Sequence, residues 1–386
     1  MKIALIAVGQ AGGKIADAIL KYETRSDLSF VSDAVAINTA ESDLLGLTQI
    51  PPERQVLIGQ TRVKGHGAGA DNELGAKLAE EDLGEIITAI DEITMSDVDA
   101  VLVVAALGGG TGSGGAPVIA RRLRTYLAEP VFGLGVLPSV VEGGIYNLNA
   151  ARSLQTVVRE VDNLVLFDND AWRHPEESLQ ASYARINEEI ARRIGVLLSA
   201  GETTNPSPDQ IVDSSEIINT LATGGVSSIG YSNSILNRQR RAFGGGYRTI
   251  GKVDETESIA RIMSIVRQSA LGRLSAPCEL DSMERGLFVV SGPPQYLSRK
   301  GVESAREWLE ETTGCMEIRS GDYPIPDTNY LAGLVLLSGV TDIPRIKELQ
   351  AIAIEAKAVM EEREARHGAA LSDLLDEKSG EIEPLF

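Results

Sequence analysis

A glycine-rich string at positions 108–115, Gly-Gly-Gly-Thr-Gly-Ser-Gly-Gly, is the strongest chemical signal in the chain. Glycine has no β-carbon, so closely spaced backbone amides and two hydroxyls can surround a polyphosphate. A flexible linker has a similar composition, but a linker would not lie between a strand-like run, Val101–Leu107, and a helical stretch, Pro117–Leu127. The string therefore predicts a phosphate-binding turn. Its expected ligand-binding residues are Gly108, Gly109, Gly110, Thr111, Gly112, Ser113 and Gly114.

A second glycine-bearing loop connects the first apolar run to the first helix. Backbone amides at a helix N-terminus suit a phosphate group, although a tight strand–helix turn has the same composition. The loop is not a P-loop, because no glycine lies five residues before Gly13 and Ile15 replaces the required Ser or Thr. Its candidate ligand-binding residues are Gly9, Gln10, Ala11, Gly12, Gly13 and Lys14.

Two more glycine-bearing loops follow strand-like runs. The loop 65–71 precedes a helix and ends at Asp71, a favourable N-cap; it is either a capped turn or a sensor of a terminal phosphate. We interpret its His66 as an incidental loop residue. The other loop is Glu142-Gly143-Gly144, and the carboxylate of Glu142 could hold ribose hydroxyls. The candidate ligand-binding residues of the first of these loops are Gly67, Ala68, Gly69 and Ala70.

A dinucleotide-binding fold is the main alternative, because Gly110, Gly112 and Gly115 match G-x-G-x-x-G. Such a site needs Asp or Glu at the end of the next strand to hold the ribose. Here that strand ends in Pro138 and Ser139, and the strand after the first loop ends in Asn38-Thr39. The sequence therefore disfavours NAD binding.

Apolar runs alternate with helix-length segments through the first half of the chain, which is typical of a doubly wound α/β fold. The expected strands are Ile3–Val8, Ala34–Ile37, Val101–Ala106, Val131–Leu137 and Leu164–Phe167. The expected helices between them are Asn72–Ile90, Pro117–Leu127 and Gly143–Val161. Ligands of such sheets bind at the carboxyl ends of the strands, where the glycine-bearing loops lie.

The second half predicts a long central helix over Pro175–Leu198 and then a smaller α+β domain. Its expected elements are a short helix near Asp213, helices Glu255–Gln268 and Ser298–Thr312, and strands Leu287–Val290, Met316–Arg319 and Leu331–Leu337. A last helix begins at Pro344, and its pattern fades past Glu361 into an acidic tail over 371–386 that we expect to be mobile. We divide the chain into a nucleotide-binding α/β domain (1–172), a central helix (173–201), a loop-bearing segment (202–243), an α+β domain (244–350) and a C-terminal helix and tail (351–386).

Composition excludes several classes of protein. Of 386 residues, 39 are glycine, and 36 Lys and Arg against 55 Asp and Glu give a net charge of −19. This acidity does not suit a nucleic-acid-binding surface; it suits a salty cytoplasm, although many ordinary cytosolic proteins are nearly as acidic. Two cysteines and three scattered histidines give no pattern for a protein-built metal centre. Because no apolar run is long enough to span a bilayer, we expect a cytoplasmic protein.

The string Gly108–Gly114 resembles the signature of the tubulin/FtsZ superfamily. Gly9-Gln10-Ala11-Gly12 is similar to the tubulin form of the first loop, whereas Thr61-Arg62 through Gly75 and Gly114-Gly115-Ala116-Pro117 look more like FtsZ. That mixture is similar to CetZ, the archaeal tubulin-like group, and the resemblance covers residues 1 to about 350.

The resemblance implies GTP and GDP as ligands, with Mg²⁺ carried by the nucleotide. Asn169 lies where the family reads the base, and Tyr183 and Asn187 match a stacking ring and a hydrogen-bonding amide on one helix face. Asn38 also falls on a nucleotide-binding position. Where tubulins carry an acid near the magnesium, this chain has Ala40, so the role of the neighbouring acids Glu41 and Asp43 stays open.

The resemblance also places the catalytic acids. Asp213 and Glu216 have the spacing of a capping box, and they fall on the family loop whose acids position or polarise the attacking water, although Ile211 replaces an FtsZ asparagine. From Asn187 to Leu198 the central helix is roughly 16 Å long, so these acids would serve the next subunit of a head-to-tail filament rather than their own nucleotide.

These inferences describe a GTPase that assembles with itself into cytoskeletal filaments and controls cell shape. The alternatives are an FtsZ-like cell-division filament protein, a non-catalytic nucleotide-gated scaffold and an NAD-dependent oxidoreductase. The basic loop Arg238–Arg248 is a candidate for lateral contacts between filaments, with a solvated loop as the alternative. The last residues, 381–386, form a candidate peptide for a tail-binding protein; we expect no nucleic-acid partner and no transmembrane segment.

Overall fold

The computed structural model describes residues 1–174, 176–200, 212–236, 254–326 and 328–376. In these ranges one ten-stranded sheet runs through the whole molecule, in the order β3-β2-β1-β4-β5-β6-β7-β10-β8-β9. Its first six strands are parallel and are β1 (Ile3–Val8), β2 (Val31–Asn38), β3 (Gln55–Leu57), β4 (Ala100–Ala106), β5 (Val131–Leu137) and β6 (Asn163–Asp168). The expected doubly wound parallel sheet is confirmed.

The second part of the sheet is mixed. Its strands are β7 (Val226–Ile235), β8 (Arg285–Gly292), β9 (Ile318–Pro324) and β10 (Tyr330–Val340). Strand β7 pairs with β6 in parallel and with β10 antiparallel, and it therefore joins the two parts into one sheet. The expected α+β pattern of the second half is present, and it continues the first sheet instead of starting a new one.

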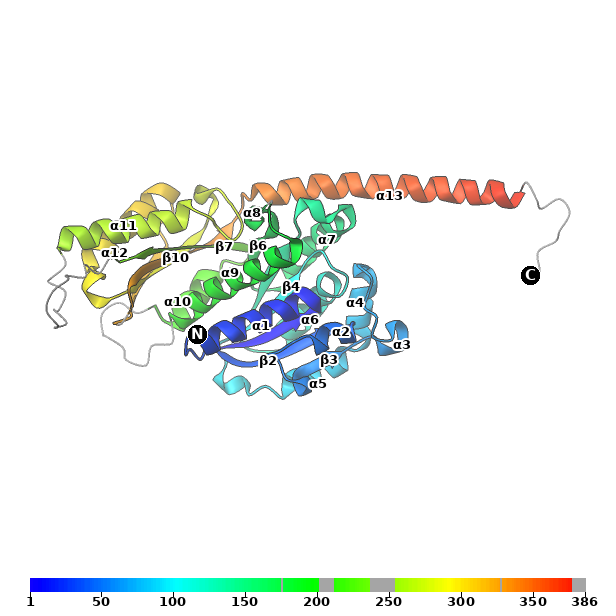
Figure 1. Ribbon diagram of the computed structural model, residues 1–386, viewed down its shortest axis with the longest axis horizontal. Coiled ribbons are helices and arrows are strands. Elements are labelled where there is room, and N and C mark those ends of the chain that lie inside the picture. The colour runs from blue at the N-terminus through cyan, green and yellow to red at the C-terminus, as the bar shows by residue number, and fades with distance from the viewer. Residues whose placement is uncertain (175, 201–211, 237–253, 327, 377–386) are drawn as a thin grey trace.

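Helices cover both faces of this sheet, and each face has its own apolar core. One face packs against α1 (Gly9–Arg25), α9 (Leu179–Ser199) and α10 (Ser214–Leu221), seen in front of the sheet in Figure 1. The other face packs against α4 (Asn72–Glu81), α5 (Leu83–Asp91), α6 (Thr111–Tyr126), α7 (Gly144–Glu160), α11 (Glu255–Leu271), α12 (Arg299–Thr313) and α13 (Pro344–Asp376). Short helices α2 (Glu41–Leu45), α3 (Gln60–Val63) and α8 (Asn169–Trp172) lie in the connections.

Two helix predictions in the first half of the chain need correction. The stretch 72–90 is two helices, because the chain turns at Asp82, whose carboxylate accepts a hydrogen bond from the Gly59 amide at 2.6 Å. Helix α6 begins at Thr111 instead of Pro117, so five of the eight residues of the glycine string, 111–115, are helical. Pro117 is tolerated inside α6 because the Ser113 carbonyl, which would accept from residue 117, accepts instead from the Ser153 hydroxyl at 2.7 Å.

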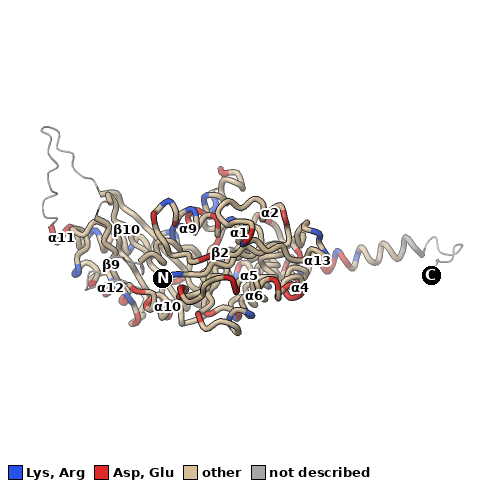
Figure 2. Tube along the Cα trace, turned by 90° about the horizontal axis from the view of Figure 1, so that it is seen from below, with Lys and Arg blue, Asp and Glu red and all other residues tan. Residues whose placement is uncertain are grey.

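The last helix also departs from the expectation, since α13 continues to Asp376 instead of fading past Glu361. Ion pairs one turn apart, Lys357–Glu361 and Arg366–Glu362, lie on its exposed part. Figures 1 and 2 show α13 projecting beyond the sheet and its other helices. The helical part of the expected tail is thus 371–376, and the rest lies outside the described residues, as do the loops 202–208 and 238–248.

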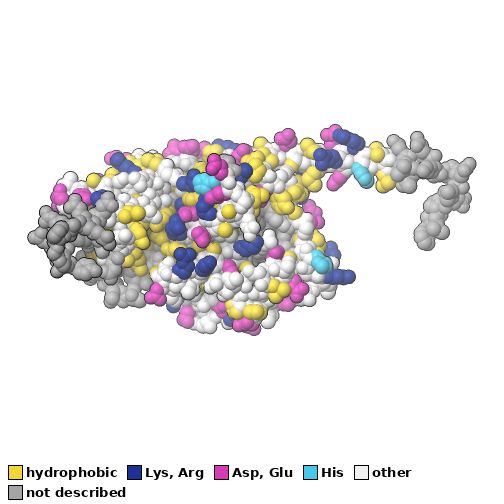
Figure 3. Space-filling view, in the orientation of Figure 1, with side chains coloured by type: hydrophobic (Ala, Val, Ile, Leu, Met, Phe, Trp, Pro, Cys, Tyr) yellow, Lys and Arg dark blue, Asp and Glu magenta, His cyan; other side chains and the backbone are white. Residues whose placement is uncertain are grey.

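Acidic and basic side chains are interspersed on the face seen in Figure 3. None of the helices in the described ranges is both long and apolar enough to cross a membrane.

Candidate functional site

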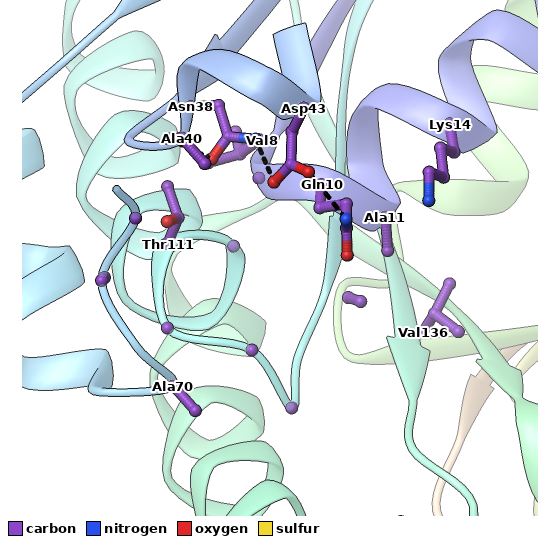
Figure 4. Close-up of a pocket in the computed structure, with 18 of the residues that line it drawn as sticks. Val8, Gln10, Ala11, Lys14, Asn38, Ala40, Asp43, Ala70, Thr111 and Val136 are labelled. Carbon is purple, nitrogen blue, oxygen red and sulfur yellow. Dashed lines mark hydrogen bonds between the residues drawn. The ribbon is translucent and has the colours of Figure 1, made fainter. Parts of the chain in front are cut away.

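A cavity of about 420 Å³ opens at the carboxyl ends of β1, β4, β5 and β6, in the size range of small-molecule sites. It gathers residues from all four glycine-bearing loops, from α2 and from α9. Figure 4 shows part of this lining, including Gln10, Asp43 and Thr111. The predicted residues that line it are Gly9, Gln10, Ala11, Lys14, Asn38, Gly67, Ala68, Gly69, Ala70, Gly108, Gly109, Gly110, Thr111, Gly112, Glu142, Asn169, Tyr183 and Asn187.

One end of the cavity is formed by the N-termini of α1 and α6, which approach each other closely. Gly9 has a φ of +76°, and a β-carbon there would lie 2.8 Å from the amide nitrogen of Gly112. Two helix N-termini side by side present unpaired amides and positive dipole ends to one place. This end of the cavity suits phosphate groups.

Four predicted ligand-binding residues do not line the cavity: Gly12, Gly13, Ser113 and Gly114. A β-carbon on Gly12 would lie 2.5 Å from the Val104 carbonyl oxygen, and one on Gly114 would lie 2.1 Å from that of Asn72. These two glycines therefore let α1 approach β4 and α6 approach α4. The hydroxyl of Ser113 donates back to the carbonyl of Gly109 in the preceding turn.

The other end of the cavity holds polar and aromatic side chains from three segments. Asn169 begins α8, and its Oδ1 is buried without a hydrogen-bond partner in the described structure. Tyr183 and Asn187 of α9 and Tyr146 of α7 line the same cavity. A buried amide oxygen costs free energy until a donor reaches it, so this end is prepared for a ligand that donates hydrogen bonds.

Glu142 is held in place by two interactions. It closes a capping box with Ser139, whose amide donates to Oε1 at 2.7 Å. It also approaches Tyr183: burial, then the negative charge of Glu142, raises the pKa of the Tyr183 hydroxyl to about 12. Tyr183 therefore stays neutral and keeps a proton to donate.

A polar group on the cavity wall contains an acid that the sequence left without a role. Figure 4 shows Asp43 of α2 between Gln10 and Asn38, which donate to its two carboxylate oxygens at 2.7 and 3.2 Å. His66, expected to be incidental, also lines the cavity. In the described ranges no group of three His, Cys, Asp or Glu side chains could hold a metal ion.

The two predicted catalytic acids lie far from this cavity. Asp213 caps α10 by accepting from the Glu216 amide at 2.9 Å, and the next residue, Ser214, donates to Asp99, which also accepts from the Lys2 amide. Asp99 precedes β4 and Lys2 precedes β1, so the acids lie at the amino ends of strands whose carboxyl ends form the cavity. Six residues of β1 span roughly 20 Å. The acids are therefore on the opposite edge of the sheet, beside the N-terminus in Figure 1.

The electrostatics of the two acids differ. Hydrogen bonds from Ser215 and from the Glu216 amide lower the pKa of Asp213. Burial, followed by the negative charge of Asp213, raises the pKa of Glu216. Glu216 is thus the better proton acceptor of the pair, and Asp213 is the helix cap.

Comparison with known proteins agrees with this geometry. Residues 2–175 match the model of the tubulin/FtsZ family, GTPase domain, and residues 176–355 match that of the tubulin-like CetZ C-terminal domain. The chain is 57% identical to tubulin-like protein CetZ3 of Haloferax volcanii over the full length of both chains.

Two solved structures from Haloferax volcanii share the fold. A GDP-bound monomer of CetZ1 is 55% identical, with a TM-score of 0.83, and the match covers 92% of this chain and all of that one. A GTPγS-bound protofilament of CetZ2 is 43% identical, also with a TM-score of 0.83, over 94% of this chain and all of that one. With two family models covering most of its length and a full-length relative above half identity, the chain belongs to the CetZ group of the tubulin/FtsZ family.

Proposed function

We propose that this protein binds GTP in the cavity, assembles head-to-tail and hydrolyses GTP at the joint between subunits. The observation that carries the proposal is the separation of the two half-sites: the cavity and the pair Asp213–Glu216 lie on opposite edges of one sheet. Neither half could complete the reaction within one chain. Stacking one subunit on the next with little rotation brings them together and gives an open filament.

The ligands named for the relatives support this assignment. A CetZ1 structure holds GDP, and a CetZ2 structure is a GTPγS-bound protofilament. In this chain, paired helix N-termini suit the phosphates, and the unpartnered Asn169 oxygen suits the N–H donors of guanine.

Exposed apolar side chains lie beside both half-sites. Val141 and Ile145 flank the cavity-lining Glu142 and are 58% and 38% exposed. On the opposite edge Met316 is 94% exposed, just before the strand that carries Arg319, whose charge acts on Glu216. Burying these side chains in a joint would favour assembly.

Mg²⁺ would enter with the nucleotide. Asp43 lies beside the phosphate end and is an acidic oxygen ligand for such an ion. When bound, the ion would neutralise phosphate charge, and the residues described here would position the nucleotide around it. We further propose a cytoplasmic filament that controls cell shape; lateral contacts through 238–248 and a partner for the tail stay predictions.

The test is phosphate release from GTP measured against protein concentration, after identification of the nucleotide that copurifies. A shared site predicts that specific activity rises steeply with protein concentration as filaments form. Filament formation is monitored by light scattering. Activity per subunit that is independent of concentration would place the whole site in one chain, and copurified NAD would refute the nucleotide assignment.

A tryptophan next to the end of the cavity that holds Asn169, here called the base end, offers a second, independent readout of nucleotide binding. Trp172 shares α8 with Asn169 and is buried, and the guanidinium carbons of Arg193 and Arg273 lie 4.2 and 5.1 Å from the centre of its ring. We expect GTP added to nucleotide-free protein to change Trp172 emission, because a ligand on Asn169 moves the ring against these cations. The change should persist in Trp308→Phe and vanish in Trp172→Phe.

A further inference from the structure

One arginine side chain from the first turn of α13 is buried beneath the cavity. Arg345 is 6% exposed. Its guanidinium donates to the Pro138 carbonyl at 2.9 Å, to Oδ1 of Asn147 at 3.3 Å and to Oδ1 of Asp168 at 3.4 Å. A further bond, at 2.9 Å, goes to Glu348 on the same helix. The planar guanidinium can reach several acceptors at once, which no other side chain does as well.

Each acceptor belongs to a different segment of the base end. Pro138 lines the cavity itself, Asn147 follows the cavity-lining Tyr146, and Asp168 precedes Asn169. The three segments leave β5, begin α7 and leave β6, so they are distant in sequence. Arg345 thus connects these three segments of the base end through its hydrogen bonds.

Asp168 depends on this contact in particular. Its carboxylate is 4% exposed and caps α8 by accepting from the Asp170 amide at 3.1 Å. Burial raises the pKa of Asp168 to about 6, the positive charge of Arg345 opposes this rise, and the charge of Asp170 adds to it. Without Arg345 a buried carboxylate would remain with no cation beside it, directly before Asn169.

We propose that Arg345 is a positioning residue that sets the base selectivity of the nucleotide site by fixing Pro138, Asn147 and Asp168. This inference rests on the proposed function, since it concerns the same cavity. It assigns to the C-terminal helix a part in the site, although no residue of α13 lines the cavity in the described structure.

The experiment measures dissociation constants for GTP and ATP in the wild type, in Arg345→Met and in Lys347→Met. Lys347 is the matched control, because it is an exposed cation on the same helix that pairs with Asp342. We expect Arg345→Met to lose roughly tenfold of the preference for GTP over ATP, equivalent to one displaced base contact, and Lys347→Met to keep it. Unchanged preference in a folded Arg345→Met protein would overturn the inference, whereas a wild type without preference for GTP would overturn the proposed function.

The pH dependence separates positioning from general destabilisation. In Arg345→Met the pKa of Asp168 rises further, so lowering the pH from 8 to 6 protonates the unpaired carboxylate and should restore part of the GTP preference. In the wild type the pKa of Asp168 is about 6, so the same change of pH protonates a carboxylate that is already paired with Arg345, and no gain is expected. The phosphate groups titrate alike in GTP and ATP, so their effect cancels in the ratio.

Two further variants cover the case in which Arg345→Met does not fold. Arg345→Lys keeps the charge but loses the planar set of donors, and we expect an intermediate preference. Asp168→Asn with Arg345→Met removes the unpaired charge and keeps a good N-cap, and we expect more preference for GTP than in Arg345→Met alone. A full wild-type preference in Arg345→Lys, or no recovery in the double variant, would contradict the positioning role.

Discussion

Glu216→Gln is expected to reduce GTP turnover at least roughly a hundredfold while GTP affinity stays unchanged, because a general base contributes on that order. Glu216 lies on the edge of the sheet opposite the cavity, so it has no contact with its own nucleotide. Burial and the charge of Asp213 raise its pKa, which favours accepting a proton from water. Glutamine keeps the size of the side chain and removes that ability. The measurements are single-turnover phosphate release and equilibrium binding of GTP.

The variant should also assemble with GTP into filaments that do not disassemble, as seen by light scattering over time, because hydrolysis no longer weakens the joint. Two controls separate chemistry from folding. Asp213→Asn keeps the N-cap, since Asn and Asp cap equally well, and Ser215→Ala removes only the hydroxyl that donates to Asp213. Both should leave α10 folded. Loss of GTP binding in Glu216→Gln would show that Glu216 belongs to the cavity and would refute the assignment.

Much of the α/β part could be predicted from the sequence because its chemistry is local. Buried parallel strands such as Val101–Ala106 are continuous apolar runs, and glycine-bearing loops at their ends mark where backbone approaches a ligand. The same reasoning could not separate two kinds of glycine. Gly109 lines the cavity, whereas Gly114 lets α6 pack against α4. Both lie in one string, and only the packing partner distinguishes them.

Strand β7 was missed for a related reason. Five of its ten residues are serine or asparagine, which hides the apolar pattern of a strand. In the fold, Ser227 and Ser228 are fully buried because neighbouring elements satisfy them: Ser227 donates to Asn163 at 2.7 Å, and Ser228 donates to the Ala276 carbonyl at 2.7 Å. Partners so distant in sequence cannot be inferred from one segment, and the contacts of Arg345 with the base end escaped prediction in the same way.

Gly109→Asp is expected to abolish GTP binding, with at least roughly a hundredfold loss of affinity, because like charges in a partly desolvated site repel strongly. Gly109 lines the cavity beside the helix N-termini, its φ is not in the left-handed region, and a β-carbon there meets no atom within 4 Å. The backbone therefore accepts a side chain, and the carboxylate would compete with the phosphates for the same amides. Gly109→Asn, equal in size and uncharged, is the control and should lose much less affinity.

Mixing the two impaired proteins tests the shared site directly. Glu216→Gln has an intact cavity without its acid, and Gly109→Asp has the acid without nucleotide, so neither should turn over GTP alone. Where the cavity of the first meets the acid edge of the second, one complete site forms. In an equal mixture with random contacts this is roughly a quarter of the joints. Turnover should therefore appear on mixing and rise with total concentration. If the mixture stays as inactive as its components while Gly109→Asp still associates with wild-type filaments, hydrolysis does not use the neighbouring subunit's acid.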